Sequence, residues 1–112
     1  MSYGLIKSGI LALKAAEQVT IASGVATITQ GVVQLTSETS TTDDLDTITL
    51  NSAVNIETYL PFVILIAASG HTITVKHGTD NITLNAAGDF SLTDVKALLL
   101  WNDGTNYHDL GA

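Results

Sequence analysis

The sequence predicts an all-β fold, namely a small antiparallel β-sandwich or barrel. Sixteen threonines and nine glycines, against one proline, are typical of short strands joined by turns. Apolar and polar residues alternate over several short segments, as they do in half-buried strands. Turn-forming residues recur about every ten residues, a spacing expected for an all-β domain.

Residues 1–17 are ambiguous, because some of their apolar residues have helical spacing whereas others alternate as in a strand. Lys14 interrupts the apolar run, so we interpret the segment as part of the mature protein rather than a signal peptide. We expect either an N-terminal arm or a short element packed on the domain, followed by a single β domain over residues 18–112. The segment has a charge of +1 against −8 for the remainder. Its candidate interaction residues are Leu5, Ile6, Ile10, Leu11 and Leu13.

The first predicted hairpin spans residues 18–29, with Ser23-Gly24 as a two-residue turn. Pairing Ala22 with Val25 leaves one apolar face and one polar face, as a half-buried antiparallel ribbon requires. The expected apolar pairs are Ile21 with Ala26 and Val19 with Ile28.

Two further hairpins are predicted. In residues 71–84 we expect a loop from His77 to Asp80, with Val75 facing Ile82. The segment 97–110 contains Asp103-Gly104, the strongest short turn signal in the chain.

Other expected strands are 32–35, 45–50, 61–67 and 89–92, whereas 36–44 and 51–60 are interpreted as loops. No internal repeat is strong enough to predict a solenoid. Segments 62–68 and 97–101 are apolar on both faces, which is unusual in a small antiparallel domain. Either they are central between two layers, or another subunit covers one face.

The charge balance excludes several function classes. The chain has a net charge of −7, four lysines and no arginine, so it lacks the basic stripe of a nucleic-acid-binding protein.

No apolar run approaches the ~18 residues of a membrane span. The absence of cysteine excludes disulfides and thiolate metal sites.

Neither the histidines nor the acidic cluster predicts a metal site. His71 and His77 lie on one face of an extended strand but about 20 Å apart, too far to share a metal ion. Asp43, Asp44 and Asp46 could bind calcium, but their spacing lacks the glycine and distal glutamate of an EF-hand loop. We expect them to form turns, and we predict no metal and no cofactor.

No catalytic motif is present, so we predict that the protein is not an enzyme. Trp101 and Tyr107 flank the Asp103-Gly104 turn on opposite faces of the predicted hairpin. Such aromatics can stack on sugars, but they also close small cores or interfaces. We therefore include both among the candidate interaction residues.

The order of the motifs is more specific than any one of them. "TTDDLDTITL" is followed by "FVILIAASGHTITVKHGTDNITLNAAGDFSLTD" and then by "ALLLWNDGTNYHDLGA". Over residues 32–112 this order resembles a small β module of tailed-phage structural proteins, which include capsid-decoration and tail-fibre proteins. Such modules often carry an aromatic residue, commonly tryptophan, after the Asp-Gly-Thr turn. Here Asn106 and Tyr107 follow the turn and Trp101 precedes it.

The resemblance implies a virion component without catalytic residues. Because the chain is short, we expect a capsid decoration (cement) protein on the capsid surface. It would form a homotrimer and bind the major capsid protein or another virion protein. The alternative is a module of a tail appendage, at a fibre tip, that binds a receptor or carbohydrate.

Overall fold

The computed structural model describes residues 6–7, 10–11, 15–51 and 62–110, with side chains from residue 15 onward. These residues form strands, turns and bends; no helix among them is long and apolar enough to cross a membrane. The strands are β1 (Ile6–Lys7), β2 (Ile10–Leu11), β3 (Glu17–Thr20), β4 (Val25–Ile28), β5 (Val32–Thr36), β6 (Thr42–Leu45), β7 (Thr47–Leu50), β8 (Phe62–Ala67), β9 (Thr72–Val75), β10 (Ile82–Thr83), β11 (Phe90–Thr93), β12 (Ala97–Asn102) and β13 (Tyr107–Asp109).

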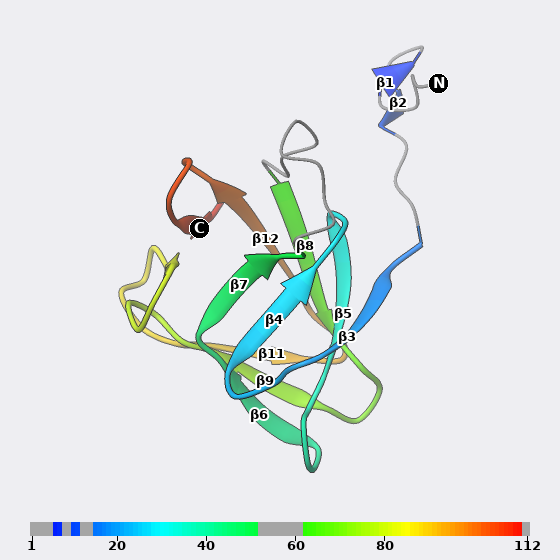
Figure 1. Ribbon diagram of the computed structural model, residues 1–112, viewed down its shortest axis with the longest axis vertical. Coiled ribbons are helices and arrows are strands. Elements are labelled where there is room, and N and C mark those ends of the chain that lie inside the picture. The colour runs from blue at the N-terminus through cyan, green and yellow to red at the C-terminus, as the bar shows by residue number, and fades with distance from the viewer. Residues whose placement is uncertain (1–5, 8–9, 12–14, 52–61, 111–112) are drawn as a thin grey trace.

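The β body consists of three sheets around one core, consistent with a small β-sandwich (Figure 1). A six-stranded sheet has the order β10-β13-β12-β8-β5-β3, and a three-stranded sheet has the order β11-β9-β6. Strands β4 and β7 form the third sheet. The all-β prediction is confirmed, but the expectation of antiparallel pairing is only partly correct, because the pairings are mixed.

The chain winds repeatedly through the sheets of the β body, so that strands of successive circuits pair in parallel. The chain passes through β5, β6 and β7 in one circuit, and β8 and β9 follow in the next. Consequently β5 is parallel to both β3 and β8, while β6 is parallel to β9 and β4 to β7. Parallel neighbours need a crossover connection. Here strands of the other sheets provide that connection, so no helix is required.

The core is filled by the inward residues of all three sheets. Alternation buries every second side chain in the longer strands, as in β8, where Val63, Leu65 and Ala67 are buried. The largest fully buried side chains are Ile21, Ile28, Leu35, Leu45, Leu65, Ile73, Ile82, Leu92, Leu100, Val33, Val63 and Val75.

The first predicted hairpin has the correct turn but the wrong partners. Ser23 and Gly24 have φ angles of 51° and 81°, and the main chains of Ala22 and Val25 exchange hydrogen bonds of 2.9 and 3.0 Å. Beyond this bridge the strands diverge, because β3 pairs with β5 and β4 pairs with β7. The inward residues nevertheless include those predicted: Val19, Ile21, Ala26 and Ile28.

The predicted strand 45–50 is two strands that meet at a corner, and β6 occupies part of the predicted loop 36–44. The carbonyl of Gly24 accepts hydrogen bonds from the N–H groups of Asp46 and Thr47, at 2.8 and 3.1 Å. A Cβ on Gly24 would lie 2.5 Å from Oδ2 of Asp46, so the close approach requires glycine. The corner moves the chain from the three-stranded sheet into the two-stranded sheet.

The predicted hairpin over residues 71–84 is wrong. Strand β9 pairs with β6 and β11, whereas β10 pairs with β13 in another sheet. The side chain of Asn81 instead continues the edge of β7, because its amide exchanges hydrogen bonds of 2.7 and 3.0 Å with the main chain of Ile48.

The third predicted hairpin is confirmed. Strands β12 and β13 are antiparallel, with Trp101 opposite His108 and Asn102 opposite Tyr107. At the turn, the N–H of Asp103 donates to the carbonyl of Asn106 at 3.0 Å.

The N-terminal strands β1 and β2 form a separate two-stranded sheet, which stands apart from the β body (Figure 1). The β body begins at the edge strand β3, so Glu17, the last residue of the predicted N-terminal segment, belongs to the six-stranded sheet.

Candidate interaction surface

The central strands of the six-stranded sheet form an apolar ladder on their outward side. Strand β12 is antiparallel to β8, which places Ala97 opposite Ile66, Leu99 opposite Ile64, and Trp101 opposite Phe62. All six residues alternate with buried ones, so they point away from the core. Directly opposed side chains in a sheet are close enough to contact one another.

The neighbouring strands extend this ladder sideways. Leu110 hydrogen-bonds through its N–H to the carbonyl of Leu99, at 3.1 Å, and His108 is opposite Trp101. On the other side, Val32 is opposite Ile64 and Gln34 is opposite Ile66. We define the neutral face as Val32, Gln34, Phe62, Ile64, Ile66, Ala97, Leu99, Trp101, His108 and Leu110.

The neutral face contains no aspartate, glutamate or lysine. The remaining outward positions of this sheet's strands are also uncharged, namely Gln18, Thr20, Thr36 and Thr83. For a chain of net charge −7, these outward positions are notable because none of them is a carboxylate or an ammonium group. Contiguous exposed apolar surface commonly marks an interaction site.

No second layer from the described residues covers this face completely. Phe62 is 57% exposed and Leu110 is 53% exposed, while Leu99 and Trp101 are each 38% exposed. Ile64 and Ile66 are half-buried. Among the described residues, these exposures do not fit the first of the two explanations, a central position between two layers.

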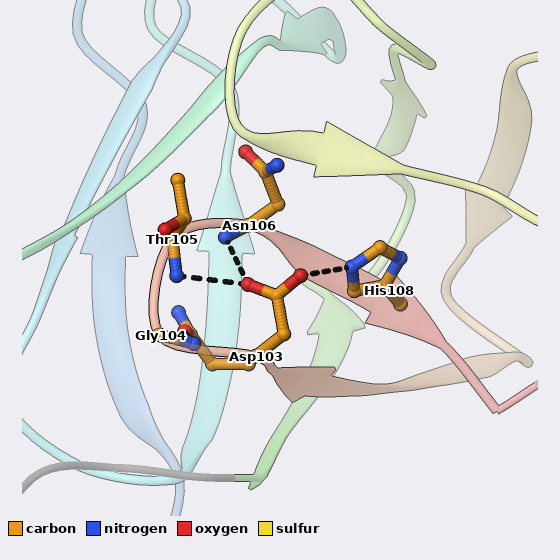
Figure 2. Close-up of polar contacts among 6 residues, drawn as sticks. Asp103, Gly104, Thr105, Asn106 and His108 are labelled. Atoms are coloured by element: carbon orange, nitrogen blue, oxygen red, sulfur yellow. Dashed lines mark hydrogen bonds and ion pairs between the residues drawn. The ribbon is translucent and has the colours of Figure 1, made fainter.

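One end of the neutral face carries a polar loop (Figure 2). The Asp103 carboxylate accepts hydrogen bonds from the N–H groups of Thr105 and Asn106, both at 2.8 Å. Its other oxygen lies 2.8 Å from Nε2 of His108. The His108 ring stacks on Trp101 with the ring centroids 4.8 Å apart. The loop thereby fixes the position of both rings.

This hydrogen bonding also sets the charge of the loop. The N–H of Asn106, then the His108 ring and the N–H of Thr105, lower the pKa of the Asp103 carboxyl from 3.8 to about 2. Hydrogen bonds that favour the carboxylate lower its pKa. Asp103 is therefore ionised at neutral pH and holds the turn through its acceptor oxygens.

The other two histidines join distant segments of the β body. Nδ1 of His71 lies 3.0 Å from Oγ of Ser37 and 3.2 Å from its N–H. Nδ1 of His77 accepts a hydrogen bond of 2.9 Å from the N–H of Leu84. These contacts give His71 and His77 structural roles at a corner and a loop.

The prediction that the acidic cluster forms turns is wrong for Asp43 and Asp44, which lie in strand β6, whereas Asp46 lies at the corner between β6 and β7. Asp43 accepts hydrogen bonds from the N–H groups of Glu38 and Asp44, both at 2.8 Å, and Asp46 lies against Gly24. Within residues 15–51 and 62–110, no group of three or more histidines and carboxylates is arranged to hold a metal ion.

The predicted interaction residues fall into three groups. Trp101 lies on the neutral face, on the opposite side of the sheet from Tyr107, as predicted for this hairpin. Tyr107 points inward and is 3% exposed, so it belongs to the core. For Ile6, Ile10 and Leu11 the backbone lies in β1 and β2, whereas Leu5 and Leu13 lie outside the described residues.

The sequence interpretation missed most of the neutral face, although part of the signal was present. The two-sided apolar segments contained Phe62, Ile64 and Leu99, but nothing local indicated that these segments pair with each other. Leu110 follows the last strand, so it had no alternation to mark it. The lack of charge becomes visible only when the outward residues of separate strands are read together.

No protein-family model matches the chain, and neither a curated protein nor a solved structure matches it.

Proposed function

We propose that this protein is a non-enzymatic structural protein of a phage virion, specifically a capsid decoration protein that binds the head as an oligomer, with a trimer expected. The observation that carries the proposal is the neutral face, because exposed apolar surface without charge suits contact with protein. The order of motifs over residues 32–112, which resembles phage structural modules, supports the virion as the setting.

The N-terminal segment is proposed to attach the protein to the shell. An isolated two-stranded hairpin is at best marginally stable in water, so β1 and β2 need a further surface to pack on. The segment is rich in apolar residues and carries +1 in residues 1–17 against −8 in the remainder. Such a segment can lie on a partner through its apolar side chains or add to a sheet edge.

The test is binding to undecorated capsids, using the full chain and a variant that lacks residues 1–14. This deletion retains Ala15, whose carbonyl accepts a hydrogen bond from Gln30. We expect the full chain to co-sediment with the shells, and the deletion variant to melt similarly but remain in solution. Absence of binding by the full chain would contradict the decoration function. Retained binding by the stable deletion variant would move the attachment site to the β body.

A glycan-binding role at a fibre tip is the second candidate, and exposed Trp101 is the observation that favours it. Aromatic rings commonly stack on sugars, but one face of this indole is already covered by His108. Trp101 is the single tryptophan in the chain, so its fluorescence reports directly on this position. A saturable emission shift with added oligosaccharides would favour this function over decoration.

A further inference from the structure

The centre of the neutral face is an exposed apolar surface, which commonly marks an interaction site. Its central residues, Phe62, Ile64, Leu99 and Trp101, come from two adjacent strands in direct register. A polar partner surface would have to give up water here without gaining a hydrogen bond in return. The partner must therefore also present an apolar surface.

Charge narrows the choice of partner. A basic partner would gain little at the centre of the face, because a lysine or arginine buried against Ile64 or Leu99 would have no carboxylate to pair with. The Asp103 carboxylate lies at the end of the face, where it contacts His108. Two copies of the chain repel each other, since each has a net charge of −7. They can meet most closely where neither carries charge, and the centre of the neutral face, formed by β8 and β12, satisfies this condition on both sides.

The size of the face agrees with a contact between copies. Strands β5, β8, β12 and β13 have five, six, six and three residues. With about 3.3 Å per residue and about 4.8 Å between strands, they cover roughly 300 Å². Two copies packed face to face therefore cover about 600 Å² in projection, and their protruding side chains bury more. This is below the size of stable specific interfaces, which begins at about 1,000–1,200 Å². An interface of this size gives weak, concentration-dependent association.

We infer that the neutral face is the contact surface for a second copy of this chain, with β8 and β12 of one copy packed on the same strands of the other. Because the same patch is used on both sides, the contact is self-complementary and two-fold, so it gives a dimer in place of the trimer expected above. The inference rests on the proposed use of this face for protein contact, but not on the identity of the shell.

Sedimentation equilibrium of the full chain tests this, from low micromolar to near-millimolar concentration. The Leu99→Lys variant places an ammonium group in the centre of the face. Its control is Val95→Lys, because Val95 is 86% exposed, lies in the turn before β12 and undergoes the same charge change.

We expect reversible association of the unmodified chain and of Val95→Lys. Leu99→Lys should weaken it by about a hundredfold, since each copy would bury an unpaired charge. Melting temperatures measured at low concentration identify a variant that fails to fold, in which case Ile64→Thr replaces it. Monomers at every concentration, or equal association of both lysine variants, would overturn the inference.

A second measurement shows whether the neutral face is covered by another copy of the chain or by another part of the same chain. The chain has no cysteine, so Leu99→Cys and Val95→Cys each introduce a single thiol. We expect the thiol of Leu99→Cys to react slowly with maleimide at high protein concentration and rapidly on dilution. The thiol of Val95→Cys should react at one rate throughout.

If the thiol of Leu99→Cys reacts slowly with maleimide at all protein concentrations, another part of the same chain covers it. This result would overturn the inference. Both measurements omit capsids. A protein that self-associates but does not bind shells therefore contradicts the decoration function alone. One that binds shells as a monomer contradicts the contact between copies alone.

Discussion

The six-stranded and three-stranded sheets have the same inward pattern and opposite outward patterns. Outward from β6, β9 and β11 lie two cross-strand rows, Thr42-Thr72-Thr93 and Asp44-Thr74-Ser91. Outward from β12 and β8 lie Trp101-Phe62 and Leu99-Ile64 instead. Short hydroxyl side chains suit a surface in contact with water, whereas aromatic and aliphatic rows suit contact with protein. Folding alone needs only the inward pattern, so the outward difference indicates function.

The largest expected effect comes from the inward positions, which the two sheets share. Leu65→Ala in β8 and Ile73→Ala in β9 each leave a cavity in the core and should destabilise the protein by about 3 kcal/mol. Ile64→Ala, one position from Leu65 but outward, should cost about 1 kcal/mol or less in the dilute protein. Urea unfolding measures all three. A similar cost at Ile64 and Leu65 would mean that the outward side is also packed within one copy.

An exchange of outward residues between the two sheets should have an intermediate effect. Ile64→Thr gives the neutral face a hydroxyl, and should weaken self-association by about tenfold while largely preserving strand preference. Thr74→Ile makes the reverse change in the three-stranded sheet, where one apolar residue among Thr, Ser and Asp is too small a patch to bind a second copy. Sedimentation measures both. New association of Thr74→Ile equal to that of the unmodified chain would show that any apolar outward residue suffices.

The smallest expected effect is the contribution of the loop beside the neutral face to the pH dependence of stability. Because folding lowers the pKa of Asp103 from 3.8 to about 2, its contribution to stability is present above 3.8 and is lost as the pH falls through about 2. Asp103→Asn should therefore show a shallower fall in melting temperature over this range.

Asp89, beside the three-stranded sheet, provides the comparison for this titration. The N–H of His77 and then Lys76 lower the pKa of Asp89, so its contribution is lost in the same direction. Asp89→Asn should also flatten the acid limb of the curve. Identical curves for both variants and the unmodified chain would show that neither carboxylate contributes measurably to stability.

The faces of strands could be predicted from sequence, but their partners could not. Alternation correctly placed Val19, Ile21, Ala26 and Ile28 in the core, because it depends only on the pleat. The predicted strand pairings were wrong where parallel strands of separate circuits pair. It succeeded for β12 and β13, where a four-residue loop makes the neighbour in sequence the neighbour in space.

The same limit applies to the candidate surface. Trp101 could be selected because it flanks a strong turn. The alternation of side chains along the hairpin also correctly placed Trp101 and Tyr107 on opposite faces of the sheet. The pairing of Leu99 with Ile64 joins residues 35 positions apart, so it depends on the tertiary fold. Asp103 and His108 lie closer in sequence, but their contact depends on the detailed shape of the turn.

Successive circuits of the chain differ in length, and this difference has a consequence for protein engineering. Glu17 is opposite Val33 and Val32 is opposite Ile64, so one circuit takes 16 residues and the next takes 32, while the strands still stack in register. The longer circuit contains an additional strand, β6, which has no counterpart in the shorter one. Doubling a flexible loop costs only about 0.6 kcal/mol in closure entropy. The exposed corner at Thr39 and Ser40, between β5 and β6, is thus a suitable position for inserting a peptide tag or an epitope.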